Sequence, residues 1–178
     1  MIHLVPSGCE YVNIPKCGSQ SIRAALGIKD GDKYSGNRRR IGGVITLPWD
    51  RSKYVAVVRD PLARFVSCIA FLNRNYGLDF CYETWIAMDG KYPHKRMGHH
   101  LRPQIDFIQD PSKFHKLYDI SEMDQFFKDH GLGPMRRENV TTTKKMPIND
   151  QVIEWVNFKY REDYERLGQW FKASDRSP

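Results

Sequence analysis

The feature that most constrains the fold is a nearly unbroken apolar run that ends at a helix-start signal. Residues 53–59 read Lys-Tyr-Val-Ala-Val-Val-Arg, which is typical of a central strand buried on both faces of a parallel sheet. Asp60 and Pro61 follow, and they are a good N-cap and a good first helical residue. Apolar residues then recur at helical spacing at Leu62, Phe65, Val66, Ile69 and Leu72. This segment therefore predicts a buried strand followed directly by an amphipathic helix.

A second strand-to-helix junction lies near the N-terminus. Residues 11–14 (Tyr-Val-Asn-Ile) suit a short buried strand. Pro15 ends this strand because it has no N–H group to donate to a neighbouring strand. Gly18 allows the backbone to turn close to a ligand, and helical spacing resumes at Ile22, Ala25 and Leu26.

The turn between this strand and helix carries the residue types of an anion-binding site. Free N–H groups at the helix start point back at the turn, where Lys16, Ser19 and Ser21 are gathered. This combination favours a bound phosphate or sulfate. The stretch is not a Walker A loop, because that motif places its lysine after the glycines and Lys16 precedes Gly18. An ordinary turn with an exposed lysine is the alternative.

The remaining segments alternate between strand and helix patterns. We expect a loop over 29–43, strands over 44–47 and 114–120, a short helix over 80–88, a polar loop over 90–104, a helix through 126–127, a basic loop over 136–147, and a last, longest helix that begins near Asn149 or Asp150. This alternation predicts an α/β fold with a parallel sheet, in which ligands bind at the carboxyl ends of the strands. The length of 178 residues favours one domain spanning residues 1–178.

The chain carries an excess of positive charge that is spread along its length. The formal net charge is +7, which suits an anionic partner such as a nucleotide, an acidic glycan or a nucleic acid. The basic clusters are Arg38-Arg39-Arg40, Lys95-Arg96, Arg136-Arg137 and Lys144-Lys145. Such spreading favours several local anion contacts over a single nucleic-acid-binding arm.

Cysteine spacing and hydropathy give expectations about metals and location. The four cysteines form no C-x-x-C pair, so we predict neither a metal site nor a redox site. Cys17, beside Lys16, is interpreted as a spacer in the turn, with a reactive thiol as the alternative. No apolar run is long enough to cross a bilayer, and residues 1–10 lack the features of a signal peptide. We therefore expect a cytoplasmic protein with reduced thiols and no membrane partner.

Two motifs resemble those of sulfotransferases that use 3′-phosphoadenosine 5′-phosphosulfate (PAPS). The order Pro15-Lys16-x-Gly18-Ser19-x-Ser21 resembles the loop that binds the 5′-phosphosulfate in that superfamily. The stretch 58–67 resembles its 3′-phosphate motif, in which an apolar strand is followed by R-[DN]-P and then R-x-x-S.

Two further segments resemble the carbohydrate-type branch of the same superfamily. His100-Leu101-Arg102-Pro103-Gln104 resembles its H-x-x-P-Q segment, and residues 160–167 resemble its C-terminal Y-x-x-D-[YF] helix. The resemblance runs from about Glu10 to about Leu167 and implies a three-layer, P-loop-NTPase-like sulfotransferase fold around a central parallel sheet. One departure is that residues 29–53 contain no His and no Glu, where many members carry a catalytic base.

The resemblance also implies roles for individual residues. Lys16 would neutralise charge on the leaving phosphate, and Arg59 and Ser67 would bind the 3′-phosphate. The 5′-phosphosulfate would be held by Lys16, Cys17, Gly18, Ser19, Gln20 and Ser21. Catalytic base candidates are His100, which occupies the motif position, and its neighbour His99, since a neutral imidazole suits proton removal.

The implied reaction moves a sulfuryl group from PAPS to a hydroxyl or amine of a carbohydrate or small metabolite, leaving 3′,5′-ADP. The resemblance implies no metal and no nucleic-acid partner. Two alternatives stay open. One is a small P-loop nucleotide kinase, which should carry G-K-[ST] and a magnesium-binding acidic residue. The other is a non-catalytic basic module that binds RNA or another polyanion.

Overall fold

The computed structural model describes residues 2–28, 39–41, 44–46, 53–135 and 146–172. Within these ranges the protein is α/β, with a four-stranded sheet in the order β1-β2-β5-β6 and a separate two-stranded sheet. The strands of the main sheet are β1 (Ile2–Leu4), β2 (Glu10–Val12), β5 (Tyr54–Val58) and β6 (Lys116–Asp119), and the smaller sheet pairs β3 (Arg39–Ile41) with β4 (Val44–Thr46).

The main sheet is mixed, which corrects the prediction of a parallel sheet in part. β2 and β6 both run parallel to β5, with Val12 beside Ala56 and Val58 beside Asp119. β1 is antiparallel to β2, because a short turn over residues 5–9 reverses the chain between them. Three strands therefore end at the same edge of the sheet, as the sequence predicted for the two strand-to-helix junctions.

The helices follow most of the predicted pattern. They are α1 (Ser19–Ala25), α2 (Pro61–Tyr76), α3 (Tyr82–Ala87), α4 (Lys95–Leu101), α5 (Ile105–Ile108), α6 (Met123–Asp129), α7 (Asp150–Lys159) and α8 (Arg161–Leu167), with 3₁₀ turns η1 (Pro111–Lys113), η2 (Ile120–Glu122) and η3 (Gly168–Trp170). The predicted N-cap is confirmed, since the Asp60 carboxylate accepts hydrogen bonds from the N–H groups of Leu62 and Ala63.

Three predictions of local structure were wrong. The expected polar loop over 90–104 contains α4, which buries Met97 and Leu101 four residues apart on one side. The expected last helix is divided at Tyr160 into α7 and α8, and α2 is longer than either. Residues 39–41, expected in a loop, form β3. The rest of the loop over 29–38 and the basic stretch 136–145 lie outside the described residues.

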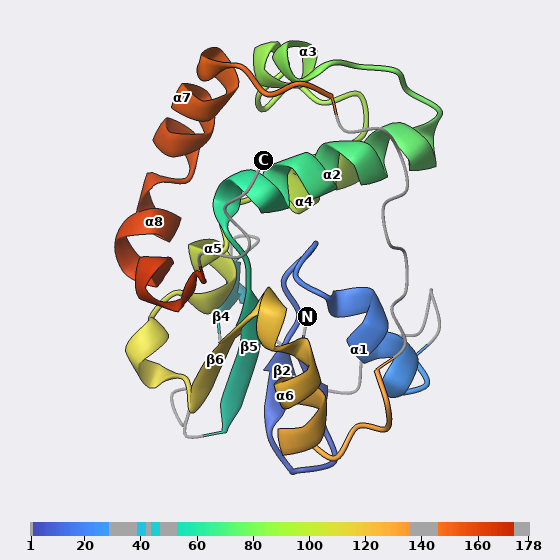
Figure 1. Ribbon diagram of the computed structural model, residues 1–178, viewed down its shortest axis with the longest axis vertical. Coiled ribbons are helices and arrows are strands. Elements are labelled where there is room, and N and C mark those ends of the chain that lie inside the picture. Colours follow the sequence, from blue (N-terminus) through green and yellow to red (C-terminus); the bar gives the residue numbers. More distant parts are fainter. Residues whose placement is uncertain (1, 29–38, 42–43, 47–52, 136–145, 173–178) are drawn as a thin grey trace.

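Buried apolar side chains form two clusters. One surrounds the sheet and includes Tyr11, Val55 and Phe126. The other lies among α2, α3, α4 and α7 and includes Phe65 and Trp85. In Figure 1, α2 extends from the upper end of β5, and the loop that follows β2 rises toward α2. Across the described ranges, no helix has the length and apolar character to cross a membrane.

Candidate functional site

The turn after β2 has a strained backbone at its lysine. Lys16 has a φ of 68°, in the left-handed region that residues other than glycine rarely adopt. Gly18 has a φ of 72° and is the N-cap of α1. A Cβ atom at Gly18 would lie 2.7 Å from the Met123 sulfur, so this position excludes a side chain for two reasons. Backbone strain often occurs at functional sites. Its presence at Lys16 supports the prediction that this turn binds an anion.

The Lys16 side chain lies against α2, within electrostatic range of two arginines. Its Nζ atom is 4.2 Å from the centre of the Phe71 ring, a cation–π contact. Burial lowers the pKa of Lys16 to about 8, and the positive charges of Arg74 and Arg59 act in the same direction. The Lys16 turn and the end of β5 are therefore close enough for their cations to repel one another.

His100 joins this group from α4, and this placement corrects the expectation that it lies in a loop. Its ring is 5.1 Å from the ring of Phe71. Burial lowers the pKa of His100 to about 4, and His99, Lys16 and Arg64 add to the effect. Its Nδ1 atom is buried without a hydrogen-bond partner in the described part of the protein. A neutral imidazole with a buried, unpartnered Nδ1 atom therefore packs on the same Phe71 ring as the Lys16 ammonium.

The other predicted site residues lie at the end of β5 and on α1, α2 and α4. Arg59 directly follows β5 and is partly exposed. Ser67 is four residues before Phe71 and so lies on the same side of α2. Ser19, Gln20 and Ser21 form the first turn of α1 and are partly exposed. His99 packs against Phe107, with ring centres 5.5 Å apart.

Cys17 is fully buried, which favours the spacer interpretation over a reactive thiol. Its thiol donates to Gln104 Oε1 over 3.3 Å and contacts the Pro15 carbonyl oxygen. All four cysteines are free thiols.

One residue that the sequence analysis gave no role, Arg64, links the Lys16 turn to α4. Arg64 is 1% exposed. Its Nε donates to the Pro15 carbonyl oxygen over 3.0 Å, and its Nη2 donates to the carbonyl oxygens of His100 and Arg102 over 3.1 and 2.8 Å. The guanidinium therefore fixes the backbone on both sides of the Lys16–His100 pair.

Gln104 and Asp163 were also assigned no role, although both lie inside the quoted motifs. Both are 0% exposed. The Gln104 amide binds the main chain of Arg59, and Asp163 accepts hydrogen bonds from the N–H groups of Gln104 and Ile105 over 2.9 and 2.8 Å. Arg64, Gln104 and Asp163 could have been found from the sequence, because each is a polar residue at a fixed position of a quoted motif.

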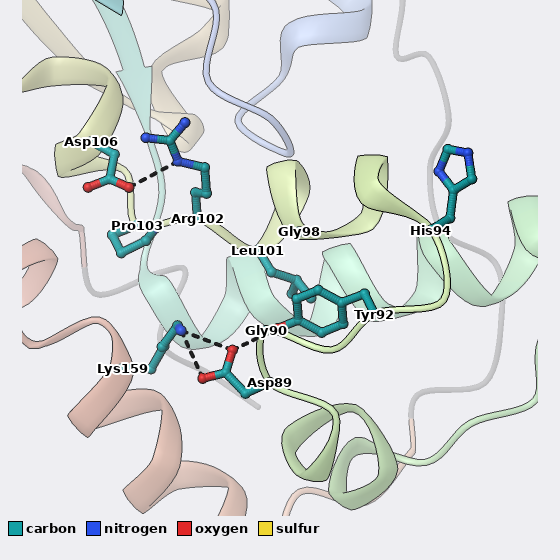
Figure 2. A pocket seen from close by; sticks show the side chains of 10 residues that line it. All are labelled: Asp89, Gly90, Tyr92, His94, Gly98, Leu101, Arg102, Pro103, Asp106 and Lys159. Atoms are coloured by element: carbon teal, nitrogen blue, oxygen red, sulfur yellow. Dashed lines mark hydrogen bonds and ion pairs between the residues drawn. The ribbon is translucent and has the colours of Figure 1, made fainter. Parts of the chain in front are cut away.

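A pocket of about 390 Å³ lies on the other side of α4 (Figure 2). Gly98, Leu101 and Arg102 line it, and helical spacing places Gly98 on the opposite side of α4 from His100. Its charged groups are paired with each other: Lys159 Nζ binds both oxygens of Asp89 over 2.9 and 2.8 Å, and Arg102 binds Asp106 over 3.0 Å. The pocket and the Lys16 group are therefore different surfaces.

The described residues hold no group of three or more His, Cys, Asp or Glu side chains that could bind a metal ion. A scan against protein-family models found no match, and searches of curated proteins and of solved structures found none either. The resemblance to sulfotransferases therefore depends on the motif residues and their arrangement.

Proposed function

We propose that this protein is a PAPS-dependent sulfotransferase with a three-layer, P-loop-NTPase-like sulfotransferase fold. The observation that carries the proposal is the position of the two motif turns. Lys16 and Arg59 follow β2 and β5, which are adjacent parallel strands. The charge of Arg59 acts to lower the pKa of Lys16. Ligands of open parallel sheets bind at this edge, and a lysine and an arginine that follow adjacent strands there suit a nucleotide with two phosphate groups.

In this proposal, Lys16 stabilises the leaving group. The acceptor oxygen forms a bond to sulfur while the bond between sulfur and the bridging oxygen of the 5′-phosphate breaks. Negative charge then grows on that phosphate, where an ammonium held in a partly buried site contributes more than it would in water. The left-handed turn at Lys16 and Gly18 brings main-chain groups of residues 17–21 to the 5′-phosphosulfate.

Arg59 and Ser67 take the 3′-phosphate. Arg59 leaves the end of β5 with a forked set of donors that matches phosphate geometry. Ser67, six residues beyond Pro61 on α2, supplies a hydroxyl. This pair gives the protein its preference for 3′,5′-ADP over nucleotides that lack a 3′-phosphate.

His100 is the base in this proposal, and the acceptor is a hydroxyl of a carbohydrate or small metabolite. The acceptor hydroxyl loses its proton as it attacks, and we assign its acceptance to the imidazole of His100, whose Nδ1 atom is buried and has no hydrogen-bond partner in the described part of the protein. The low pKa keeps the imidazole neutral at pH 7. His99, whose ring packs against Phe107, is the second candidate for the base.

Thermal unfolding with two nucleotides tests the proposal. We expect 3′,5′-ADP at a hundred times its Kd to stabilise the protein by about 2.7 kcal/mol, and ATP to do so much less. The variant Arg59→Ala should lose about 1.5–3 kcal/mol of 3′,5′-ADP binding, the value of a charge-assisted hydrogen bond, while 5′-AMP binding changes little. Equal stabilisation by ATP and 3′,5′-ADP would contradict the assignment of two phosphate sites.

A further inference from the structure

Gln104 contacts both motif turns at once, although it follows them in the chain by 87 and 45 residues. Its Oε1 accepts a hydrogen bond from the Arg59 N–H over 2.9 Å, and its Nε2 donates to the Arg59 carbonyl oxygen over 2.7 Å. The same Oε1 accepts from the Cys17 thiol over 3.3 Å. One side-chain oxygen therefore connects the turn that carries Lys16 to the strand end that carries Arg59.

The amide acts on Arg59 as a neighbouring strand would. Paired strands exchange N–H and C=O bonds between main chains, and here one side chain supplies both a donor and an acceptor to a single residue. These bonds fix the main chain of Arg59 at the point where β5 ends and before Asp60 begins α2. The direction in which the Arg59 side chain leaves the sheet is thereby set.

Asp163 holds Gln104 in this position. Asp163 Oδ2 accepts from the Gln104 N–H over 2.9 Å and lies 3.5 Å from Gln104 Nε2, while Oδ1 accepts from the Ile105 N–H over 2.8 Å. Both side chains are 0% exposed, so solvent does not compete for these bonds. Tyr160, which lies between α7 and α8, adds a further hydrogen bond to this region by donating to the Leu101 carbonyl oxygen over 2.9 Å.

We propose that Gln104 is a positioning residue that couples the two phosphate sites, so that both phosphates of one nucleotide bind together more tightly than separate binding would give. This role rests on the proposed function. Gln104 does not touch the nucleotide; it keeps Lys16 and Arg59 at the separation that the ligand requires. Because Lys16 and Arg59 are already held at a fixed separation, binding does not have to order them relative to each other. This lower entropic cost increases affinity only for a ligand that occupies both sites.

The test compares adenosine, 5′-AMP, 3′-AMP and 3′,5′-ADP by calorimetry on each variant. The coupling factor is a ratio of association constants. Its numerator is the product of the constants for 3′,5′-ADP and adenosine, and its denominator is the product of the constants for 5′-AMP and 3′-AMP. Gln104→Met keeps the side-chain length and removes the amide bonds, and we expect it to lower the coupling factor about tenfold, the factor one net hydrogen bond supplies. Each monophosphate should lose less than about threefold.

Two further variants keep the test independent of folding. Asn73→Leu removes a different side-chain amide, which bonds to Phe80 and Trp85, and should leave the coupling factor unchanged. Cys17→Ala removes the bond from the Lys16 turn to Gln104, together with the contact of the thiol with the Pro15 carbonyl oxygen, and should lower the factor less than Gln104→Met does. It serves as the test if Gln104→Met does not fold.

The possible failures differ in what they refute. Equal loss for all four ligands, or an unchanged coupling factor in both Gln104→Met and Cys17→Ala, would overturn the positioning role and leave the sulfotransferase proposal intact. Wild-type protein that binds 3′,5′-ADP no better than adenosine would refute the proposed function, and this role with it.

Discussion

Two surfaces that contain a lysine lie on opposite sides of α4, and they differ in the environment of that lysine. On one side, Lys16 and His100 have lowered pKa values, because burial and neighbouring cations disfavour their protonated forms. On the other side, Lys159 binds both oxygens of Asp89, and Arg102 binds Asp106 (Figure 2). The pocket lies on the Lys159 side.

This difference is the reason that the proposed anion site is assigned to the Lys16 side and not to the pocket. A surface whose positive charges are already paired has little to gain from an anion. A partly buried lysine whose pKa is lowered is stabilised in its charged form when an anion binds. Backbone strain at Lys16 and the buried, unpartnered Nδ1 atom of His100 also occur on the Lys16 side of the described structure.

The largest expected effect separates the two surfaces by activity. Lys16→Met should lower the rate at which PAPS is converted to 3′,5′-ADP by about 10³-fold, because it removes the cation at the leaving phosphate. Lys159→Met, the matched variant on the paired surface, should stay within about twofold. The rate can be measured with water as the acceptor. Equal losses in both variants would end the distinction between the surfaces.

A smaller effect is expected at His100. His100→Gln should lower turnover by about 10²-fold, the low end for a general base, because a pKa of about 4 makes the imidazole a weak base. The base must be unprotonated, so activity should be retained as the pH falls from 7 to 5 and be lost near pH 4. Turnover that falls already at pH 6.5 in the wild type and equally in His100→Gln would point to another group.

The smallest effect concerns stability and has opposite signs on the two surfaces. Unfolded Lys16 titrates near 10.5 and folded Lys16 near 8, so the unfolded state binds more protons between these values and the contribution of Lys16 to stability rises with pH. Lys16→Met should therefore be more stable than wild type at pH 7, by about 1–2 kcal/mol after allowance for solvent screening. This advantage should disappear by about pH 10.5.

Lys159→Met is the control for that measurement, made by urea unfolding at several pH values. It should be slightly less stable than wild type at pH 7, by at most about 1 kcal/mol, because it loses a partly exposed ion pair. A loss of stability at pH 7 in Lys16→Met would contradict the claim that its charge is held at a cost.

The sequence predicted the parts of this site that depend on neighbours along the chain. The apolar run before Arg59, the Asp60 cap and the glycine turn at Gly18 are local signals, and the structure confirms them. It could not predict which segments meet across the fold. Gln104 and Asp163 are polar residues whose burial depends on partners 45 to 59 residues away.

Two elements were missed for local reasons. α4 contains two apolar residues, Met97 and Leu101, among polar ones, so its sequence resembles a loop. The two residues are buried in the cluster that α4 forms with α2, α3 and α7. The break at Tyr160 interrupts a continuous helical pattern, because the tertiary bonds of Tyr160 and Asp163 outweigh helix continuity.

The most direct measurement is the pKa of Lys16 with and without 3′,5′-ADP, followed by NMR of labelled lysine side chains. We predict a pKa of about 8 in the free protein and a rise toward or above 10.5 in the complex, because bound phosphate stabilises the ammonium. Lys16→Met identifies the resonance. A Lys16 pKa that stays unchanged at saturating 3′,5′-ADP, with signals moving at Lys159 instead, would contradict the account.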